Sequence, residues 1–133
     1  MRPHVLDAHA LMAFLEREKG FDTVAELFSE ALTTNSRLLM TSVNVGEVLY
    51  MTLRECGAGR TAEVERVVSE LPIEVVTVDL PLARKAAEYK ATKRMSYADC
   101  FAAALAAQLK GPVVTGDPEF RAVEKGVEVI WLG

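Results

Sequence analysis

Four widely spaced acidic residues adjoin apolar segments of this 133-residue chain, namely Asp7, Glu47, Asp99 and Asp117. Asp7 ends a short apolar run, and Asp117 comes just after another one. Glu47 and Asp99 lie near the starts of segments with helical spacing. Because the carboxyl ends of parallel strands and the starts of the helices that follow them share one edge of an α/β sheet, we expect the four carboxylates to converge.

Converging carboxylates repel one another, and the repulsion raises their pKa values unless a cation compensates it. Oxygen ligands suit Mg²⁺ or Mn²⁺, with water and substrate phosphate completing the coordination. The two cysteines, Cys56 and Cys100, have no zinc-site spacing, and we expect them to be small core residues. Divalent ions can activate water and stabilise the leaving oxygen of a phosphodiester. The acidic residues therefore indicate metal-dependent phosphodiester hydrolysis.

Each of these acids also has a structural explanation as a helix cap. The segments Asn44-x-x-Glu47 and Ser96-x-x-Asp99 fit the capping-box pattern, in which a polar first residue and an acid three positions later exchange hydrogen bonds. Asp117 precedes a proline, as an N-cap often does, and Asp7 could cap the helix that follows it. Capping does not account for the apolar flanks of Glu47 and Asp99, because carboxylates close to buried surface require a compensating cation.

Short apolar runs alternate with segments of helical spacing along the chain. The runs expected to form buried strands are Pro3–Leu6, Arg37–Thr41, Ile73–Val78, Pro112–Thr115 and Val127–Trp131. The segments expected to form helices are Ala8–Lys19, Thr23–Leu32, Asn44–Cys56, Thr61–Leu71, Pro81–Lys90, Tyr97–Lys110 and a short one starting at Asp117. The alternation predicts a three-layer α/β/α fold with a parallel sheet covered on both faces. No repeat or linker divides residues 1–133, so we expect one domain.

The composition limits the classes of function. Half of the residues are hydrophobic, which is enough for a core, and the net charge of −4 argues against a nucleic-acid coat protein without excluding a nuclease. No apolar run approaches the roughly 20 residues that cross a bilayer, and the first residues contain no signal-peptide core. We therefore expect a cytoplasmic protein that does not bind membranes.

Four stretches of the chain resemble, in order, the motifs of the PIN domain, and within that family those of the VapC-type ribonuclease toxins of toxin–antitoxin pairs. They are Val5–Leu11, Val43–Val48, Met95–Ala104 and Val114–Phe120, and the third is the most specific. The resemblance implies a central five-stranded parallel sheet and Mg²⁺-dependent endoribonuclease activity on RNA. It also implies a homodimer, inhibition by a cognate antitoxin, and metal-site roles for the four acids.

The resemblance extends to residues beside the acids. Thr115 matches a hydroxyl position that supports the metal site, and Ser96 supports Asp99 as its capping partner. His9 stands where the family often has Ser, Thr or Asn. It could orient a metal-bound water or contact a phosphate, or it could be a partly buried filler.

Two further groups of residues have both a functional and a structural explanation. Five cations within eleven residues precede the third motif, namely Arg84, Lys85, Lys90, Lys93 and Arg94. They could hold RNA phosphates, for which Lys90, Lys93 and Arg94 are the best placed, or form a solvated helix face. Six apolar residues could belong to the core or to a groove for an antitoxin helix, namely Phe14, Leu27, Phe28, Leu49, Tyr50 and Leu53.

Four alternatives compete with a ribonuclease toxin. The first is a PIN-domain nuclease for RNA processing or decay that has no antitoxin. The second is a non-catalytic module that binds RNA or protein, which the presence of all four acids argues against. A phosphate-receiving signalling domain needs an acidic pair beside the first strand, but Asp7 is alone there. A haloacid-dehalogenase-type phosphatase needs a second Asp at the position of His9.

Overall fold

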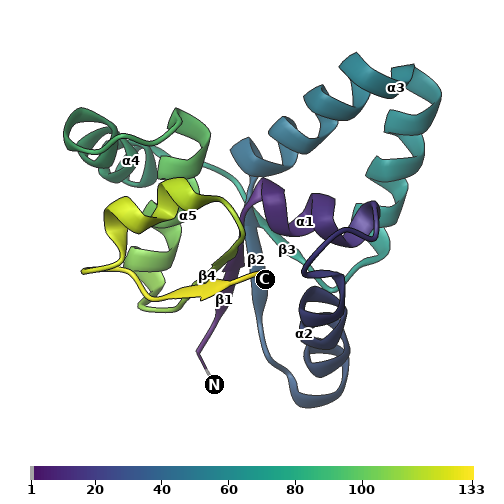
Figure 1. Ribbon diagram of the computed structural model, residues 1–133, viewed down its shortest axis with the longest axis horizontal. Coiled ribbons are helices and arrows are strands. Elements are labelled where there is room, and N and C mark those ends of the chain that lie inside the picture. Colours follow the sequence, from purple (N-terminus) through teal and green to yellow (C-terminus); the bar gives the residue numbers. More distant parts are fainter. Residues whose placement is uncertain (1) are drawn as a thin grey trace.

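The computed structural model describes residues 2–133, in which five strands form one parallel sheet between two groups of helices (Figure 1). The strands are β1 (His4–Leu6), β2 (Leu38–Thr41), β3 (Glu74–Val76), β4 (Val113–Thr115) and β5 (Val129–Trp131). The helices are α1 (Ala8–Leu15), α2 (Phe21–Thr34), α3 (Ser42–Glu70), α4 (Leu80–Thr92), α5 (Tyr97–Leu109) and the 3₁₀ helix η1 (Pro118–Val123). The predicted three-layer α/β/α fold is confirmed.

The strand order is β3-β2-β1-β4-β5, and every neighbouring pair is parallel. From β1 the chain builds the sheet outward through β2 and β3, and it then adds β4 and β5 on the other side of β1. Val5 of β1 is therefore opposite both Leu39 of β2 and Val113 of β4. The order reverses between β1 and β4, which is the position where open α/β sheets bind ligands. Asp7 follows β1 directly at this position, and Thr115 ends β4.

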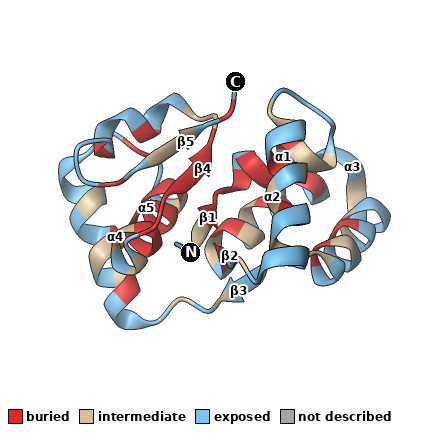
Figure 2. Ribbon diagram, turned by 90° about the horizontal axis from the view of Figure 1, so that it is seen from below, coloured by how far each residue is buried: buried red, intermediate tan, exposed pale blue. Residues whose placement is uncertain are grey.

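Alternate residues of the central strands face two separate hydrophobic cores. Val5 and Val113 pack with α4, α5 and η1, whereas Leu6 and Val114 pack with α1, α2 and α3. Helix α5 and the central strands are the most deeply buried parts of the fold (Figure 2). The alanines of α5 at positions 102–104 are fully buried, as expected for a helix that packs closely on the sheet.

Helix α3 is bent into two arms at Gly57 (Figure 1). Gly57 has φ 84° and ψ 179°, a conformation that residues with a Cβ rarely adopt. The separation predicted between the helices Asn44–Cys56 and Thr61–Leu71 is confirmed as a bend, but no loop separates the two arms. Cys56, which was expected in the core, is exposed beside the bend, whereas Cys100 is buried. In the described part of the chain, no helix has both the length and the apolar character that a membrane crossing requires.

The start of α3 differs from the predicted capping box. Thr41 is the N-cap, since its Oγ1 accepts a hydrogen bond from the backbone N–H of Asn44 at 3.0 Å. Asn44 therefore lies inside the first turn, where it is fully buried. The capping role expected for Asn44 and Glu47 is wrong, because the Glu47 side chain does not cap the end of this helix.

The outer strands and some helix ends also depart from expectation. β3 and β5 were expected to be buried, but Glu74 and Val75 are exposed and Trp131 is 37% exposed. Each of these strands has a neighbour on one side only, so an outer strand is covered less completely than a central one. Helix α1 ends at Leu15 rather than at residue 19, because Arg17 takes a left-handed conformation with φ 52°.

Gly111, between α5 and β4, sets how closely these elements approach the start of β1. A Cβ at this position would collide with the backbone carbonyl oxygen of Pro3. We expect Gly111→Ala to lower the free energy of unfolding by about 1–3 kcal/mol, because the backbone must shift to make room. Urea unfolding at equilibrium measures this change.

Gly59→Ala in α3 is the matched control, because a Cβ at Gly59 has nothing within 4 Å. Alanine there should stabilise the helix by about 0.5–1 kcal/mol. A Gly111→Ala variant as stable as the wild type would show that the contact with Pro3 does not constrain the fold.

Candidate active site

Asp7 is fully buried where β1 ends beside β4. Its Oδ1 accepts a hydrogen bond from the backbone N–H of Ala10 at 2.8 Å, so Asp7 caps α1 as well. Its Oδ2 accepts a short hydrogen bond from the Thr115 hydroxyl. The same hydroxyl oxygen accepts a hydrogen bond from the backbone N–H of Asp117 at 2.9 Å. Thr115 thus links the acid that follows β1 to the acid that follows β4.

Asp99 lies in the first turn of α5 and is 5% exposed. Only half of its predicted capping box forms: the Ser96 Oγ accepts from the Asp99 N–H at 3.2 Å. The reciprocal bond goes elsewhere, because the Ser96 N–H donates to Oε1 of Glu119 at 2.7 Å. The Asp99 carboxylate is therefore not used to cap its own helix.

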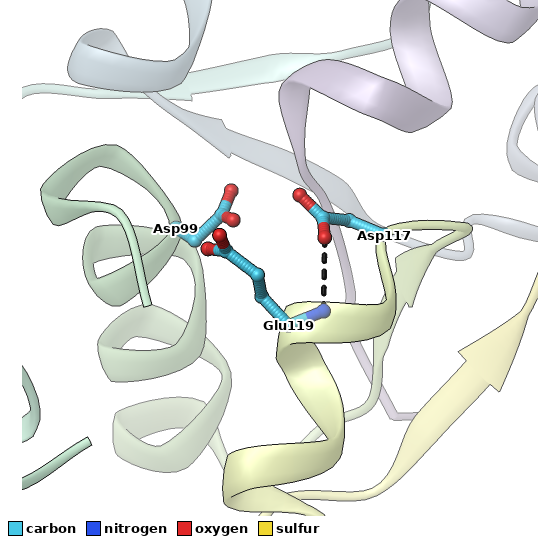
Figure 3. A group of neighbouring side chains, drawn as sticks. All are labelled: Asp99, Asp117 and Glu119. Atoms are coloured by element: carbon cyan, nitrogen blue, oxygen red, sulfur yellow. Dashed lines mark hydrogen bonds between the residues drawn. The ribbon is translucent and has the colours of Figure 1, made fainter. Parts of the chain in front are cut away.

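Three carboxylates point toward one another in front of the sheet (Figure 3). Asp99 comes from α5, Asp117 from the turn after β4, and Glu119 from η1. Each offers an oxygen, and these oxygens lie within 4.8 Å of one another. Asp117 also accepts a hydrogen bond from the Glu119 N–H at 2.9 Å, so its predicted N-cap role is confirmed.

Glu47 reaches the same region from the first arm of α3. Its Oε1 is buried and has no hydrogen-bond partner among the described residues. Burial raises the pKa of Glu47, and the charges of Asp117 and Glu119 raise it further. The fold therefore brings together all four acids selected from the sequence. Glu119 is a fifth.

Among the described residues, no positive charge compensates the carboxylates of this group, and the pKa values of three of them are raised. Burial raises the pKa of Asp7 to about 7, even though the hydrogen bonds from Thr115 and Ala10 act in the opposite direction. Burial raises the pKa of Asp99 to about 9, and the hydrogen bond and charge of Asp117 add to the effect. Carboxylates in this state bind protons readily, and a divalent cation would stabilise their charged forms.

The acids open into a cleft of about 370 Å³ between α1 and α3. Glu47, Asp99 and Asp117 line it, and farther along α1 and α3 it is lined by Glu16 and Glu55. Its donor atoms are mainly carboxylate oxygens, the type that Mg²⁺ and Mn²⁺ prefer. A divalent ion of this kind fits the residues present, since it would also give the orphaned Glu47 oxygen a partner.

His9 lies on the rim of the cleft and is exposed, so its interpretation as a partly buried filler is wrong. Its Nδ1 accepts a hydrogen bond from the Gly116 N–H at 3.2 Å, which leaves the ring proton of the neutral imidazole on Nε2. A Cβ at Gly116 would collide with the imidazole ring, so this contact requires glycine. A role for His9 toward water or phosphate remains a prediction.

The basic segment reaches the edge of the acidic group. Lys90 donates to the carbonyl oxygen of Met95 at 2.8 Å and so ties α4 to the segment before α5. Lys93 and Arg94 are exposed within three residues of Ser96, whose N–H contacts Glu119. Two cations are therefore available to solvent close to the carboxylates.

The six predicted groove residues divide between core and surface. Phe28 is 5% exposed and makes an edge-to-face contact with Phe14, so the core interpretation holds for Phe28. Tyr50 and Leu53 are 54% and 53% exposed on the first arm of α3. Of the six predicted groove residues, only Tyr50 and Leu53 are therefore exposed, so the apolar surface that these six form is smaller than expected.

Sequence reasoning missed two residues of this region. Glu119 had a signal, because the run Asp117-Pro118-Glu119 places two acids on one turn after a strand. Asn44 was interpreted as a cap, but it is buried and its amide donates to the carbonyl oxygen of Ala98 on α5 at 3.0 Å. No pattern in the chain links residue 44 to residue 98.

Comparison with known proteins gives consistent results. The family model for the PIN domain matches residues 4–126. Similar folds occur in VapBC2 from Rickettsia felis, bound to a DNA fragment from its promoter (TM-score 0.79, 10% identity, 98% of this chain and 99% of that one). They also occur in DNA-bound VapBC from Salmonella typhimurium (TM-score 0.72, 22% identity, 100% of both chains). A third similar structure is VapC20 from Mycobacterium tuberculosis, a sarcin-ricin loop cleaving toxin (TM-score 0.72, 15% identity, 90% of this chain and 94% of that one). Among curated proteins, no sequence matches significantly.

The fold and the site place the chain among α/β proteins that have a single parallel sheet and carboxylates gathered where the strand order reverses. The match over residues 4–126 shows that the chain belongs to the PIN-domain family.

The raised pKa values predict how the stability of the metal-free protein depends on pH. Asp7 and Asp99 bind protons more tightly in the folded than in the unfolded chain, where their ordinary value is 3.8. The folded state then holds more protons between about pH 4 and 9, so stability decreases as pH rises through this range. With EDTA, we expect Tm to be lower at pH 8 than at pH 5.5 by roughly 4 °C or more.

Asp99→Asn is the matched variant, because it preserves shape and leaves the Ser96 cap on the backbone N–H intact. We expect it to be as stable as the metal-free wild type at pH 8, or more stable, and to depend less on pH. Equal destabilisation by this change at both pH values, with and without metal, would show that Asp99 does not experience the other carboxylates.

Proposed function

We propose that this protein is a Mg²⁺- or Mn²⁺-dependent endoribonuclease. The observation that carries the proposal is the convergence of Asp7, Glu47, Asp99 and Asp117 where the strand order reverses, with a buried Glu47 oxygen left without a partner. A group of negative charges held in a fold without compensation is suited to binding a cation. Hydrolysis of a phosphodiester is the reaction that divalent ions held by carboxylates support most directly.

Each acid has a distinct task in this proposal. Asp99 and Asp117 would bind the metal, with Glu47 and Glu119 contributing oxygens at the edge of the group. When bound, the metal would supply an activated water and stabilise the oxygen that leaves the phosphorus. Asp7 would set the charge at the back of the site, since it is fully buried and receives the Thr115 hydrogen bond. That bond lets Thr115 fix the backbone of Asp117 against Asp7.

RNA would reach the metal from the side of α4 and α5. Lys93 and Arg94 are exposed just before α5, and the cleft walls formed by Glu16 and Glu55 would repel phosphates. Cations beside the carboxylates can hold the phosphates next to the scissile one. Lys90 has a smaller part in this proposal, since one of its donors already binds Met95.

A toxin role extends this proposal. Structural neighbours include VapBC assemblies bound to DNA and a toxin–antitoxin complex from Klebsiella pneumoniae. By analogy, this chain would form a homodimer, and a cognate antitoxin would inhibit it. The exposed Tyr50 and Leu53 on α3 supply an apolar surface for such a partner. A PIN-domain nuclease of RNA processing or decay would have the same site without this partner.

Metal-dependent cleavage is the direct test of the nuclease. Purified protein should cut structured RNA with Mg²⁺ or Mn²⁺, and EDTA should abolish the reaction. Asp99→Asn and Asp117→Asn should each lower the cleavage rate by about 100-fold or more, because a ligand is lost while the fold remains. A gel assay of labelled RNA measures the rates, and a cognate antitoxin should block the reaction. Full activity in EDTA would exclude the metal mechanism, whereas metal and RNA binding without cleavage would favour the non-catalytic module.

The basic segment is tested by the salt dependence of RNA binding to the uncleaving Asp117→Asn protein. Adding Arg94→Ala should weaken binding and lower the slope of log affinity against log salt by about one, since one phosphate contact is lost. Arg66→Ala, an exposed position on the second arm of α3, is the control and should change neither value. If the two variants had equal RNA affinities and equal salt slopes, Arg94 would be a solvated surface residue that does not contact RNA.

A further inference from the structure

The Asn44 side chain uses both ends of its amide to connect separate parts of the fold. It is fully buried in the first turn of α3. Its Oδ1 accepts a hydrogen bond from the Thr41 hydroxyl at 2.5 Å, and its Nδ2 donates to the carbonyl oxygen of Ala98 at 3.0 Å. A carbonyl oxygen can only accept, so the end of the amide that faces Ala98 must be the NH₂ group.

These bonds join three elements next to the acidic site. Thr41 ends β2, Asn44 belongs to α3, and Ala98 belongs to α5. Glu47 follows Asn44 by three residues on the same face of α3, and Asp99 directly follows Ala98. The bond from Asn44 to Ala98 is therefore a link between the backbone segments that carry these two carboxylates.

The two carboxylates lie on different helices, so their separation depends on how α3 packs against α5. The charge of Asp117 raises the pKa of both Glu47 and Asp99. A shift of α3 relative to α5 would therefore move these two carboxylates out of position. A neutral amide opposes this displacement with directional hydrogen bonds and adds no charge to the group.

We propose that Asn44 is a positioning residue, which fixes α3 against α5 so that Glu47 and Asp99 lie at the separation a divalent ion requires. This inference rests on the proposed metal-dependent function. It assigns to Asn44 no contact with metal or RNA. Its effect is transmitted through the Ala98 backbone to Asp99 and through the first turn of α3 to Glu47.

The test compares two buried polar residues on α3. Asn44→Leu keeps the branched shape of the side chain but removes both hydrogen bonds. Thr52→Val is the matched control, because Thr52 is 6% exposed and its hydroxyl donates only to the Val48 carbonyl oxygen within α3, at 2.8 Å. Both changes replace a buried polar side chain with an apolar one on the same helix. Only the first breaks a link to α5.

Isothermal titration calorimetry with Mn²⁺ alone measures affinity on each folded variant, independently of cleavage. We expect Asn44→Leu to weaken Mn²⁺ binding by about 10- to 100-fold, as loss of an outer support of metal ligands does. Thr52→Val should change it by less than about threefold. In the cleavage assay, Asn44→Leu should lower kcat while KM for RNA stays nearly constant. Should Asn44→Leu fail to fold, Asn44→Ser, whose shorter side chain does not span to Ala98, replaces it.

The outcomes separate this inference from the function on which it rests. A wild type that neither binds Mn²⁺ nor cuts RNA overturns both. A wild type that does both, with Mn²⁺ affinities equal in the Asn44 and Thr52 variants, overturns the positioning role alone. The positioning role is also overturned if Mn²⁺ affinity falls in proportion to Tm in both variants. Such a result would reflect a loss of stability rather than a change in the separation of the two helices.

Discussion

Mutual repulsion among carboxylates is the interaction on which the rest of this structure depends. Five acids from four parts of the chain gather where the sheet reverses its strand order, namely Asp7, Glu47, Asp99 and the neighbouring Asp117 and Glu119. Burial makes their charged forms costly, and each charge makes the next one costlier. The fold must supply the free energy that holds them together, and it does so through two hydrophobic cores on either side of the sheet.

Neutral hydrogen bonds hold the site in register without adding charge. Thr115 receives the Asp117 N–H and donates to Asp7, which fixes the ends of β4 and β1. The Ser96 N–H binds Glu119 and so connects α5 to η1. Asn44 connects α3 to α5. The Asp7 carboxylate is buried and the Ala98 carbonyl oxygen is partly buried, so the loss of Thr115 or Asn44 would leave a polar group without a partner as well as loosen the site.

The proposed function requires an acidic protein to bind RNA, which is itself negatively charged. The net charge of −4 gives no general attraction for nucleic acid, and the cleft is itself lined by carboxylates. In the proposed ribonuclease the attraction would be local and would come from a bound cation and from the exposed Lys93 and Arg94 beside α5. In the proposed function, this arrangement would favour a phosphate at the metal and disfavour one elsewhere along the cleft.

The sequence by itself determined the fold class and the four acids. Alternating buried strands and helices require a parallel α/β sheet, because only that arrangement buries strands of this apolar character on both faces. The sequence also determined the break at Gly57, since a backbone with φ 84° favours a residue without a Cβ. These properties depend on the residue itself and on its near neighbours, so they can be derived from local patterns.

Only the tertiary structure decided which acids meet and what holds them. The strand order places β4 beside β1, and that pairing brings Thr115 against Asp7 across 108 positions of chain. The partner of the Ser96 N–H is Glu119 rather than the nearby Asp99, and the Asn44 NH₂ group binds Ala98 on another helix. Local sequence offers each of these groups a plausible nearby partner. The choice between near and distant partners depends on how the helices pack against the sheet, which is a property of the whole chain.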